Sequence, residues 1–292
     1  LSEGSELVAV MRRNGELAED YAKRHNVPKW FTDADALIQD PDVTAVYIAT
    51  PPSTHKEYAL RVCAAGKPAY VEKPMARNYA ESRDITLAFE QANLPLFVAY
   101  YRRALPRFLK AKETLMAGRI GKVTGVTVRY TSPANRSPER PNLPWRVLAE
   151  EAGAGLFLDL GSHTLDILDF LLGELKHVGG RATNTGGRYA VEDGVSMHFL
   201  LPNGALGTGH WNFMGFAKED IIVIDGTEGR LSFSTFGSEP VRLETHSGVE
   251  EFDLPNPKHV QHPFIQTMVN SLLGKGECTS TGHSAMRTGY VM

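Results

Sequence analysis

Residues 43–74 read VTAVYIATPPSTHKEYALRVCAAGKPAYVEKP, and their pattern is the clearest indication of the fold class. Two short apolar runs, 43–49 and 69–71, are separated by a proline-rich break at 50–52 and by a segment of helical character that ends near Gly66. A strand, a helix and a second strand without a hairpin signal predict a βαβ unit, whose strands run parallel. The chain is therefore expected to contain an α/β domain.

The same alternation continues on both sides of this unit. The expected strands are 7–11 and 94–100, and the expected helices are 16–25, 33–40 and 78–91. Right-handed crossovers place the carboxyl ends of such strands along one edge of the sheet. Residues that directly follow a strand, such as Arg12, Thr50 and Lys73, should share that edge, where open α/β sheets bind their ligands.

A dinucleotide-binding sheet normally opens with a strand and a glycine-rich turn, which seats the pyrophosphate on the N-terminus of a helix. No GxGxxG pattern occurs in this chain. If the run at 7–11 is the second strand of such a sheet, the first βα unit lies before Leu1. We therefore expect a Rossmann-type parallel sheet that lacks its first βα unit in these residues.

The character of the chain changes after residue 100. Helices are expected at 103–116 and 262–273, and strands at 123–130, 195–200, 205–211, 220–224, 229–233 and 241–245. Neighbouring strands without intervening helices predict a mostly antiparallel sheet. We expect two domains: residues 1–100 form a dinucleotide-binding domain, and residues 101–292 form an α+β domain with a large open sheet for substrate binding and oligomerisation.

Composition narrows the class of protein. The chain has 292 residues, of which 42% are hydrophobic and 22% charged, and its formal net charge is −3. The absence of a polybasic run argues against a nucleic-acid partner, and no apolar run reaches the roughly 18–20 residues of a membrane helix. The two cysteines, Cys63 and Cys278, form no CxxC or Cys/His cluster. We therefore expect no metal site and no disulfide scaffold, and cytoplasm is the default location.

Glu72-Lys73-Pro74 directly follows the expected strand at 69–71. Proline disfavours the α region for the residue before it, so Lys73 is expected in an extended or turn conformation at the end of the strand. A lysine held there is suited to act as a catalytic acid or to bind an anion. Taken alone, however, the three residues favour an ordinary surface lysine, and a functional interpretation needs further motifs.

Residues 153–166, GAGLFLDLGSHTLD, are the second stretch with candidate chemistry. Apolar residues recur at helical spacing from Asp159 onward, which places Asp159 and His163 one turn apart on the same face. A carboxylate beside a histidine orients the ring and favours its charged form, and a general base is built in this way. In the structural alternative, which is favoured for an isolated Asp-x-x-x-His, Asp159 caps the helix and His163 is an ordinary hydrogen-bonded histidine.

Taken together, these motifs resemble the Gfo/Idh/MocA oxidoreductase family. The matching residues, in chain order, are Ala49-Thr50-Pro51-Pro52 with His55, Ala65-Gly66-Lys67-Pro68 leading into Glu72-Lys73-Pro74, Arg103-x-x-Pro106, Gly118-x-x-Gly121-x-Val123, Trp145-Arg146, and Gly153-x-Gly155 leading into Asp159, Gly161, His163 and Asp166. They span nearly the whole chain. Two departures are the missing glycine-rich first turn and Ala154, which stands where the family has a glycine. The resemblance implies a Rossmann domain, a C-terminal domain with a large open sheet, and a nicotinamide cofactor between them.

The resemblance also implies roles for individual residues. Lys73, Asp159 and His163 resemble the family's catalytic residues. His163 would take the proton of a hydroxyl group, Lys73 would stabilise negative charge on the same oxygen, and Asp159 would orient the substrate or the ring. The expected substrate contacts are these three residues and Arg103, and the expected cofactor contacts are Arg12, Arg13, Thr50, Pro51, Pro52, His55, Glu72, Lys73, Trp145 and Arg146. Tyr101 and Arg102 open the second domain near the expected cleft.

The cofactor preference is read from Arg12 and Arg13, which follow the expected strand at 7–11. An acidic residue at this place binds the ribose 2′-hydroxyl of NAD, whereas an arginine suits the 2′-phosphate of NADP. We therefore expect NADP rather than NAD, unless both arginines are solvated turn residues.

The leading interpretation is an NADP-dependent oxidoreductase that acts on a hydroxy or keto group of a sugar, polyol or related small molecule. Two alternatives remain open: an NAD-dependent glycoside hydrolase on the same fold, and a non-catalytic cofactor-binding protein. The resemblance further implies a homo-dimer or tetramer that assembles through the C-terminal sheet.

Overall fold

The computed structural model of the chain describes residues 2–134 and 143–292. Its first part contains β1 (Ala9–Met11), α1 (Gly15–His25), β2 (Lys29–Phe31), α2 (Ala34–Gln39), β3 (Val46–Ile48), η1 (Pro52–Thr54), α3 (His55–Ala64), β4 (Ala69–Val71), α4 (Tyr79–Gln91) and β5 (Leu96–Val98). The second part contains η2 (Tyr101–Ala104), α5 (Pro106–Met116), β6 (Val123–Pro133), η3 (Trp145–Val147), α6 (Ala149–Ala152), η4 (Phe157–Gly161), α7 (Ser162–Leu172), β7 (Lys176–Thr183), β8 (Gly194–Leu200), β9 (Leu206–Gly215), β10 (Glu219–Gly226), β11 (Gly229–Phe233), β12 (Val241–Thr245), β13 (Gly248–Phe252), α8 (His262–Leu272) and α9 (Gly282–Val291). Among the described residues, no helix combines the length and apolar character needed to cross a bilayer.

Local sequence signals explain where the N-terminal helices begin. Asn14, Asp33 and Asn78 directly precede α1, α2 and α4, and each side chain accepts a hydrogen bond from a backbone N–H in the first turn of its helix. Such caps satisfy donors that a helix leaves free at its N-terminus. The strands between the helices are short, and β4 and β5 are buried at every residue. The predicted βαβ alternation is thereby confirmed.

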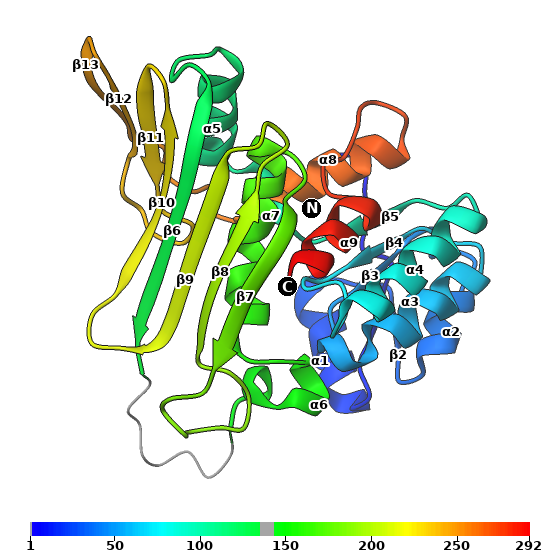
Figure 1. Cartoon of the computed structure of the whole chain (residues 1–292). Helices are drawn as coiled ribbons and strands as arrows, with labels where there is room; N and C mark the ends of the chain where they lie inside the picture. The colour runs from blue at the N-terminus through cyan, green and yellow to red at the C-terminus, as the bar shows by residue number, and fades with distance from the viewer. Residues whose placement is uncertain (1, 135–142) are drawn as a thin grey trace.

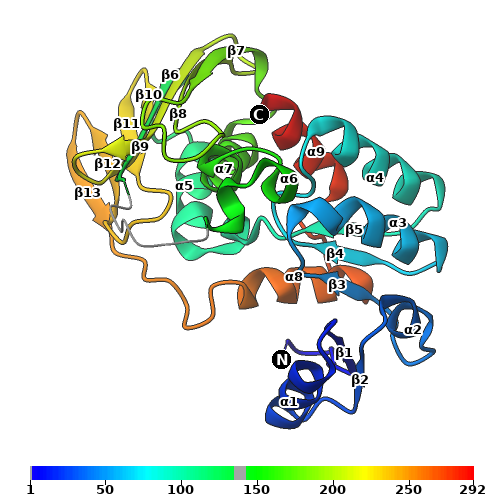
Figure 2. The same cartoon turned by 90° about the horizontal axis from the view of Figure 1, so that it is seen from below.

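The parallel strands form two separate sheets. β1 pairs with β2, while β3, β4 and β5 pair in that order. A cavity of about 930 Å³ lies between β1 and β3 and is lined by residues of both strands. The unit formed by β1, α1 and β2 stands apart from β3–β5 (Figure 2). A doubly wound sheet has one more parallel strand at this place. The described residues supply no strand there.

An eight-stranded sheet dominates the second part, with the strand order β13-β12-β11-β10-β6-β9-β8-β7. All neighbouring strands are antiparallel except β6 and β9, which run parallel. The helices α5 and α7 cover one face (Figure 1), and alternate residues such as Val126, Val128 and Trp211 are buried under them. The predicted fold class, a Rossmann-type sheet followed by a large, mostly antiparallel open sheet, is confirmed.

Two of the strands in the large sheet, β7 and β13, lie outside the strands predicted from the sequence. β7 is exposed along most of its length and contains Gly179 and Gly180, and β13 is exposed except at Phe252. Both strands stand at the edges of the sheet. An edge strand with little buried surface does not need alternating apolar residues, so the usual sequence signal is missing.

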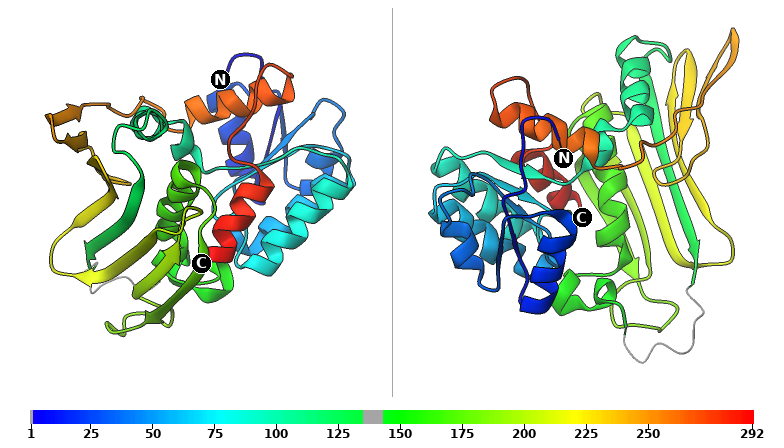
Figure 3. Two further views of the ribbon diagram at one scale, coloured as in Figure 1. Left: turned by 45° about the horizontal axis from the view of Figure 1, so that its top comes forward. Right: turned by 180° about the vertical axis from the view of Figure 1, so that it is seen from behind.

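The last two helices return to the first part of the chain. Phe264 of α8 packs with Tyr70 and Phe97, and Thr281, just before α9, forms a β-bridge with Phe97. Figure 3 shows α8 and α9 beside the parallel sheet formed by β3, β4 and β5. α9 was not predicted, because the face that it buries is made of small and polar residues with little apolar pattern. The C-terminal end of the chain therefore ties the two parts together.

Candidate active site

The two motifs singled out in the sequence meet in space. Lys73 lies two residues beyond the end of β4, and Asp159 lies in η4, 86 residues later. The Lys73 ammonium group donates to the Asp159 carboxylate and also, at 2.9 Å, to the Asp159 carbonyl oxygen. The two side chains are 14% and 15% exposed, so the ion pair is largely withdrawn from solvent. This contact holds the carboxyl end of the parallel sheet against the start of α7.

The turn that carries Asp159 is tightly built. η4 is a π-helical segment that continues into α7, and such segments are frequent at functional sites. Before it, the N–H of Gly155 donates to both oxygens of the Glu192 carboxylate, at 2.8 and 2.9 Å. A Cβ on Gly161 would lie 2.5 Å from the ring of Phe157, so a side chain there would force the ring or the turn to shift. Close packing therefore fixes the direction in which Asp159 points.

Arg146 completes the surroundings of the Asp159 carboxylate. Its Nε donates to Oδ2 of Asp159 at 3.1 Å, so each carboxylate oxygen has a cationic partner. The guanidinium also lies over the ring of Trp145, 4.4 Å from the ring centroid. The structure thus brings Trp145 and Arg146, which were predicted to contact the cofactor, next to the predicted catalytic pair.

His163 lies on α7, one turn beyond Asp159, and is only 4% exposed. The rings of Tyr100, Tyr101 and Phe236 approach its ring edge-on, with centroids 6.1, 5.5 and 5.8 Å away. Its Nδ1 is buried without a hydrogen-bond partner among the described residues. The imidazole is therefore held by aromatic packing rather than by polar contacts.

The electrostatic surroundings of His163 differ from the expectation. The sequence predicted that Asp159 orients either the substrate or the ring. Its carboxylate is paired with Lys73 and Arg146, and no hydrogen bond joins it to His163. Burial lowers the pKa of His163 well below its usual value, and the positive charges of Lys73 and Arg102 lower it further. These surroundings favour the neutral form of the ring, and neutral imidazole is the form that accepts a proton.

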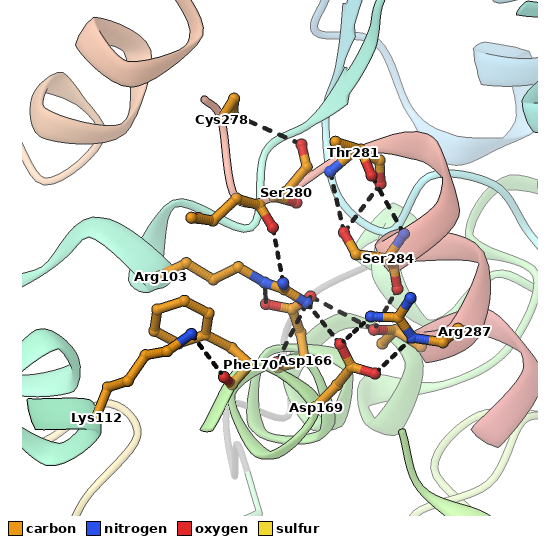
Figure 4. A network of polar contacts seen from close by, with 12 residues as sticks. Arg103, Lys112, Asp166, Asp169, Phe170, Cys278, Ser280, Thr281, Ser284 and Arg287 are labelled. Atoms are coloured by element: carbon orange, nitrogen blue, oxygen red, sulfur yellow. Dashed lines mark hydrogen bonds and ion pairs between the residues drawn. The ribbon is translucent and has the colours of Figure 1, made fainter. Parts of the chain in front are cut away.

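Arg103, which was predicted to contact substrate, has a structural environment instead. Its side chain is 4% exposed, and its Nε and Nη2 donate to the Asp166 carboxylate at 2.8 and 2.7 Å. Asp169 and the carbonyl oxygen of Thr279 accept further hydrogen bonds from it, and Arg287 pairs with Asp169 (Figure 4). Every nitrogen of the guanidinium is engaged, so Arg103 connects η2, α7 and the segment before α9 and is not available to a substrate hydroxyl.

His55, which was predicted to contact the cofactor, is fully buried. Its Nε2 lies 2.7 Å from the carbonyl oxygen of Thr50, and its Nδ1 lies 3.0 Å from the carbonyl oxygen of Pro74. The ring thus joins the turn after β3 to Pro74, the residue that follows Lys73. Pro52 is buried as well, which leaves Thr50 and Pro51 as the accessible residues of this turn.

The other predicted cofactor residues lie at the ends of the parallel strands. The Glu72 carboxylate accepts hydrogen bonds from the Tyr47 hydroxyl at 2.5 Å and from the Gln261 amide at 3.0 Å. Arg12 and Arg13 are exposed just beyond β1, and the described residues offer their side chains no ion pair. Arg12 and Thr50 both line the cavity between β1 and β3. The two arginines are thus available to an anion at the edge where a dinucleotide was expected.

Two family signatures cover most of the chain. Residues 1–100 match the oxidoreductase family with an NAD-binding Rossmann fold, and residues 108–232 match the GFO/IDH/MocA C-terminal domain. The chain belongs to the Gfo/Idh/MocA oxidoreductase family. The family predicted from the ordered motifs is thereby confirmed, and with it the class of enzyme, an NAD-binding oxidoreductase.

Relatives of this Gfo/Idh/MocA protein are similar over most of its length. Oxidoreductase P35 of Formosa agariphila is 36% identical over 292 residues, which is 100% of this chain and 90% of the relative. The 1,5-anhydro-D-fructose reductase of Ensifer adhaerens is 29% identical over 97% of this chain and 85% of the relative. A solved structure of levoglucosan dehydrogenase, in complex with NADH and levoglucosan, has a TM-score of 0.87 at 24% identity and covers 98% of this chain and 85% of that chain. This last similarity shows that the fold is shared.

The site of this Gfo/Idh/MocA protein also includes residues that no motif singled out. Phe236 belongs to the connection between β11 and β12 and reaches His163 from the large sheet, and Tyr100 reaches it from the end of β5. An aromatic residue gives no chemical signal in a single sequence, because most aromatic residues serve the core. Arg102 was expected near the cleft, facing the cofactor or the substrate, and its proximity to His163 became evident in the structure.

Proposed function

We propose that this protein transfers a hydride between a nicotinamide cofactor and a hydroxy or keto group of a sugar, polyol or related small molecule. The observation that supports this most directly is the Lys73–Asp159 ion pair beside the buried, neutral His163. A proton acceptor and a cation next to each other suit the oxidation of a secondary alcohol, in which a hydroxyl proton must leave while negative charge develops on oxygen.

Each of the three side chains takes one step in this scheme. When bound, the nicotinamide supplies the hydride acceptor or donor. His163 accepts the proton of the substrate hydroxyl in the direction of oxidation and returns it in the direction of reduction. Lys73 donates a hydrogen bond to the reacting oxygen, and Asp159 orients the substrate through a neighbouring hydroxyl group. Holding the reacting carbon in place contributes a large further part of the rate.

We further propose that the cofactor is NADP, with Arg12 and Arg13 at its 2′-phosphate. Both arginines are exposed at the carboxyl end of β1, and Arg12 lines the same cavity as Thr50. An arginine recognises a phosphate through two parallel hydrogen bonds, which a 2′-hydroxyl cannot match. The other residues proposed to hold the cofactor are Thr50, Pro51, Glu72, Lys73, Trp145 and Arg146.

A fluorescence titration with NADPH and NADH tests this cofactor assignment. We expect tighter binding of NADPH, and we expect the double variant Arg12→Ser/Arg13→Ser to lose about tenfold or more of its NADPH affinity while its NADH affinity changes little. The matched control is Arg129→Ser, an exposed arginine of the large sheet that is paired with Glu219. Equal affinity of the parent protein for the two cofactors, or a preference for NADH, would refute the assignment.

The proposed substrate class rests on the relatives. One of them is named a 1,5-anhydro-D-fructose reductase, and another, 30% identical over 77% of this chain and 64% of its own length, is a levoglucosan dehydrogenase of Pseudarthrobacter phenanthrenivorans. Both names denote carbohydrate derivatives, and the paired, largely buried Lys73 and Asp159 suit a polyhydroxylated ligand. A screen of sugars and polyols for cofactor reduction is the direct test.

The same titration separates the two alternatives. A glycoside hydrolase on this fold would retain its cofactor without exchange and would turn over without net cofactor consumption. A non-catalytic cofactor-binding protein would bind the cofactor but reduce none of it with any substrate. The presence of Lys73, Asp159 and His163 in one site favours hydride transfer over the non-catalytic alternative.

We also propose that the chain forms a homo-dimer or tetramer through the large sheet. Helices cover only one face of that sheet (Figure 1), and residues such as Thr127, Thr208 and His210 are exposed on the other. Analytical ultracentrifugation is expected to show a dimer or tetramer, and a monomer at micromolar concentration would contradict the proposal. We also propose that the two domains divide at residue 100. A cytoplasmic location is proposed as well, and it fits the two free cysteines.

A further inference from the structure

The connection between β11 and β12, residues 234–240, reaches from the large sheet to His163, and one carboxylate binds three of its backbone N–H groups. Asp220 accepts hydrogen bonds from the backbone N–H groups of Thr235, Phe236 and Gly237, at 3.0, 2.6 and 3.2 Å. Three donors on one carboxylate fix the backbone of this loop, and with it the position of the Phe236 ring. That ring lies 5.8 Å from the ring of His163.

Arg102 also contacts the 234–240 loop. Its guanidinium carbon lies 4.5 Å from the centroid of the Phe236 ring and 5.4 Å from that of Tyr101, and its Nη1 donates to the carbonyl oxygen of Thr235 at 2.7 Å. Its Nε is buried without a partner among the described residues. No carboxylate forms an ion pair with Arg102 in the described part of the chain. A buried cation without such a partner costs free energy, so its retention calls for a functional reason.

We propose that Arg102 is a positioning residue for proton transfer, which holds the rings of Tyr101 and Phe236 against the ring of His163 and places a fixed positive charge beside it. The inference deepens the proposed function, because it rests on His163 as the proton acceptor. A base that must be ready for a substrate proton is useful only when it is not already charged. The contact between Phe236 and His163 fixes where the imidazole lies, and the charge of Arg102 favours its neutral form.

The charges around His163 support this role. The groups that face it from the packed elements are Lys73 after β4, Arg102, Tyr100 and Tyr101 around η2, Phe236 from the loop, and Asp159 and Asp166 one turn away on either side. Asp159 is paired with Lys73 and Arg146, and Asp166 is paired with Arg103. Both nearby carboxylates are therefore committed to other cations. Asp220, which binds the 234–240 loop, is an acidic neighbour of Arg102 but forms no ion pair with it, so the charge of Arg102 still acts on the imidazole.

The test compares two variants that loosen the same loop but differ in charge next to His163. Arg102→Met removes the charge and the bond to Thr235. Arg107→Met is the matched control, since Arg107 donates to the carbonyl oxygens of Gly237 and Glu239 in this loop, while its charge is not among those that act on His163. His163 is titrated directly by NMR of protein labelled at its histidines, with His163→Asn to assign the signal, and the pH profile of kcat/KM for alcohol oxidation is measured in parallel.

Loss of a nearby cation makes protonation of the ring easier, so the pKa of His163 should rise in Arg102→Met and stay in place in Arg107→Met. The acid limb of kcat/KM should move to higher pH in the first variant alone, and Arg102→Lys, which keeps the charge, should restore it. Arg102→Gln, which keeps a donor for Thr235, serves if the methionine variant does not fold. An unchanged titration of His163 in a folded, uncharged variant would overturn the inference. Absence of turnover in the parent protein, with the NMR shift present, would instead refute the proposed function.

Discussion

Replacing Lys73 by methionine is expected to lower kcat/KM for hydride transfer by about 10²–10⁴-fold, the range typical of a positioned acid–base group. The change removes the hydrogen-bond donor for the reacting oxygen and also the cation that pairs with Asp159. Methionine has a similar length, so packing around the end of β4 should be largely preserved. The measurement is the rate of cofactor reduction with a substrate found in the sugar and polyol screen.

The control for this prediction is Lys122→Met, which changes an exposed lysine between α5 and β6. This variant should retain the activity of the parent protein. Because Lys73 is also proposed to hold the cofactor, both variants are compared at saturating cofactor, so that the loss reports the chemical step. Turnover by Lys73→Met within a few-fold of the parent would exclude the proposed role of this lysine.

The largest loss of stability is expected from Arg103→Met. Arg103 and Asp166 form a fully buried ion pair, with side chains 4% and 1% exposed. Removing one partner of such a pair typically costs about 3–5 kcal/mol, because the other charge is left in the interior without compensation. Arg287 can still pair with Asp169 but is not bonded to Asp166. We expect a decrease of about this size in the free energy of unfolding, measured by urea denaturation.

The matched control is Arg129→Met, which breaks an ion pair with Glu219 whose side chains are 60% and 37% exposed. Solvent screens such a pair, so the expected loss is only about 0–1 kcal/mol. If Arg103→Met were no more destabilising than this control, Arg103 would not have the structural role that its burial indicates, and the predicted substrate contact would regain support.

Much of the fold was predictable because its signals are local. Alternating apolar runs and helical segments identified β1, β3, β4 and β5, and caps such as Asn14 and Asp33 begin their helices within a few residues of the predicted places. The edge strands β7 and β13 and the helix α9 escaped prediction, because they bury little apolar surface or bury small and polar residues. Their positions are decided by pairing and packing with distant parts of the chain.

Part of the candidate site was likewise predictable from the sequence, and part was not. The ordered set of motifs was enough to identify the family and the candidates Lys73, Asp159 and His163. Which charges meet depends on how distant parts of the chain pack. This packing pairs Asp159 with Lys73 and Arg146 instead of with His163.

Burial decided the remaining roles. Arg103 and His55 were predicted to contact ligands, but both are buried and form internal hydrogen bonds. Phe236 and Arg102 lie beside the buried ring of His163. The physical reason is that the protonation state and the role of an ionisable side chain depend on burial and on neighbours that lie far away in the sequence. A motif specifies the chemical group, whereas the packed chain specifies its partners.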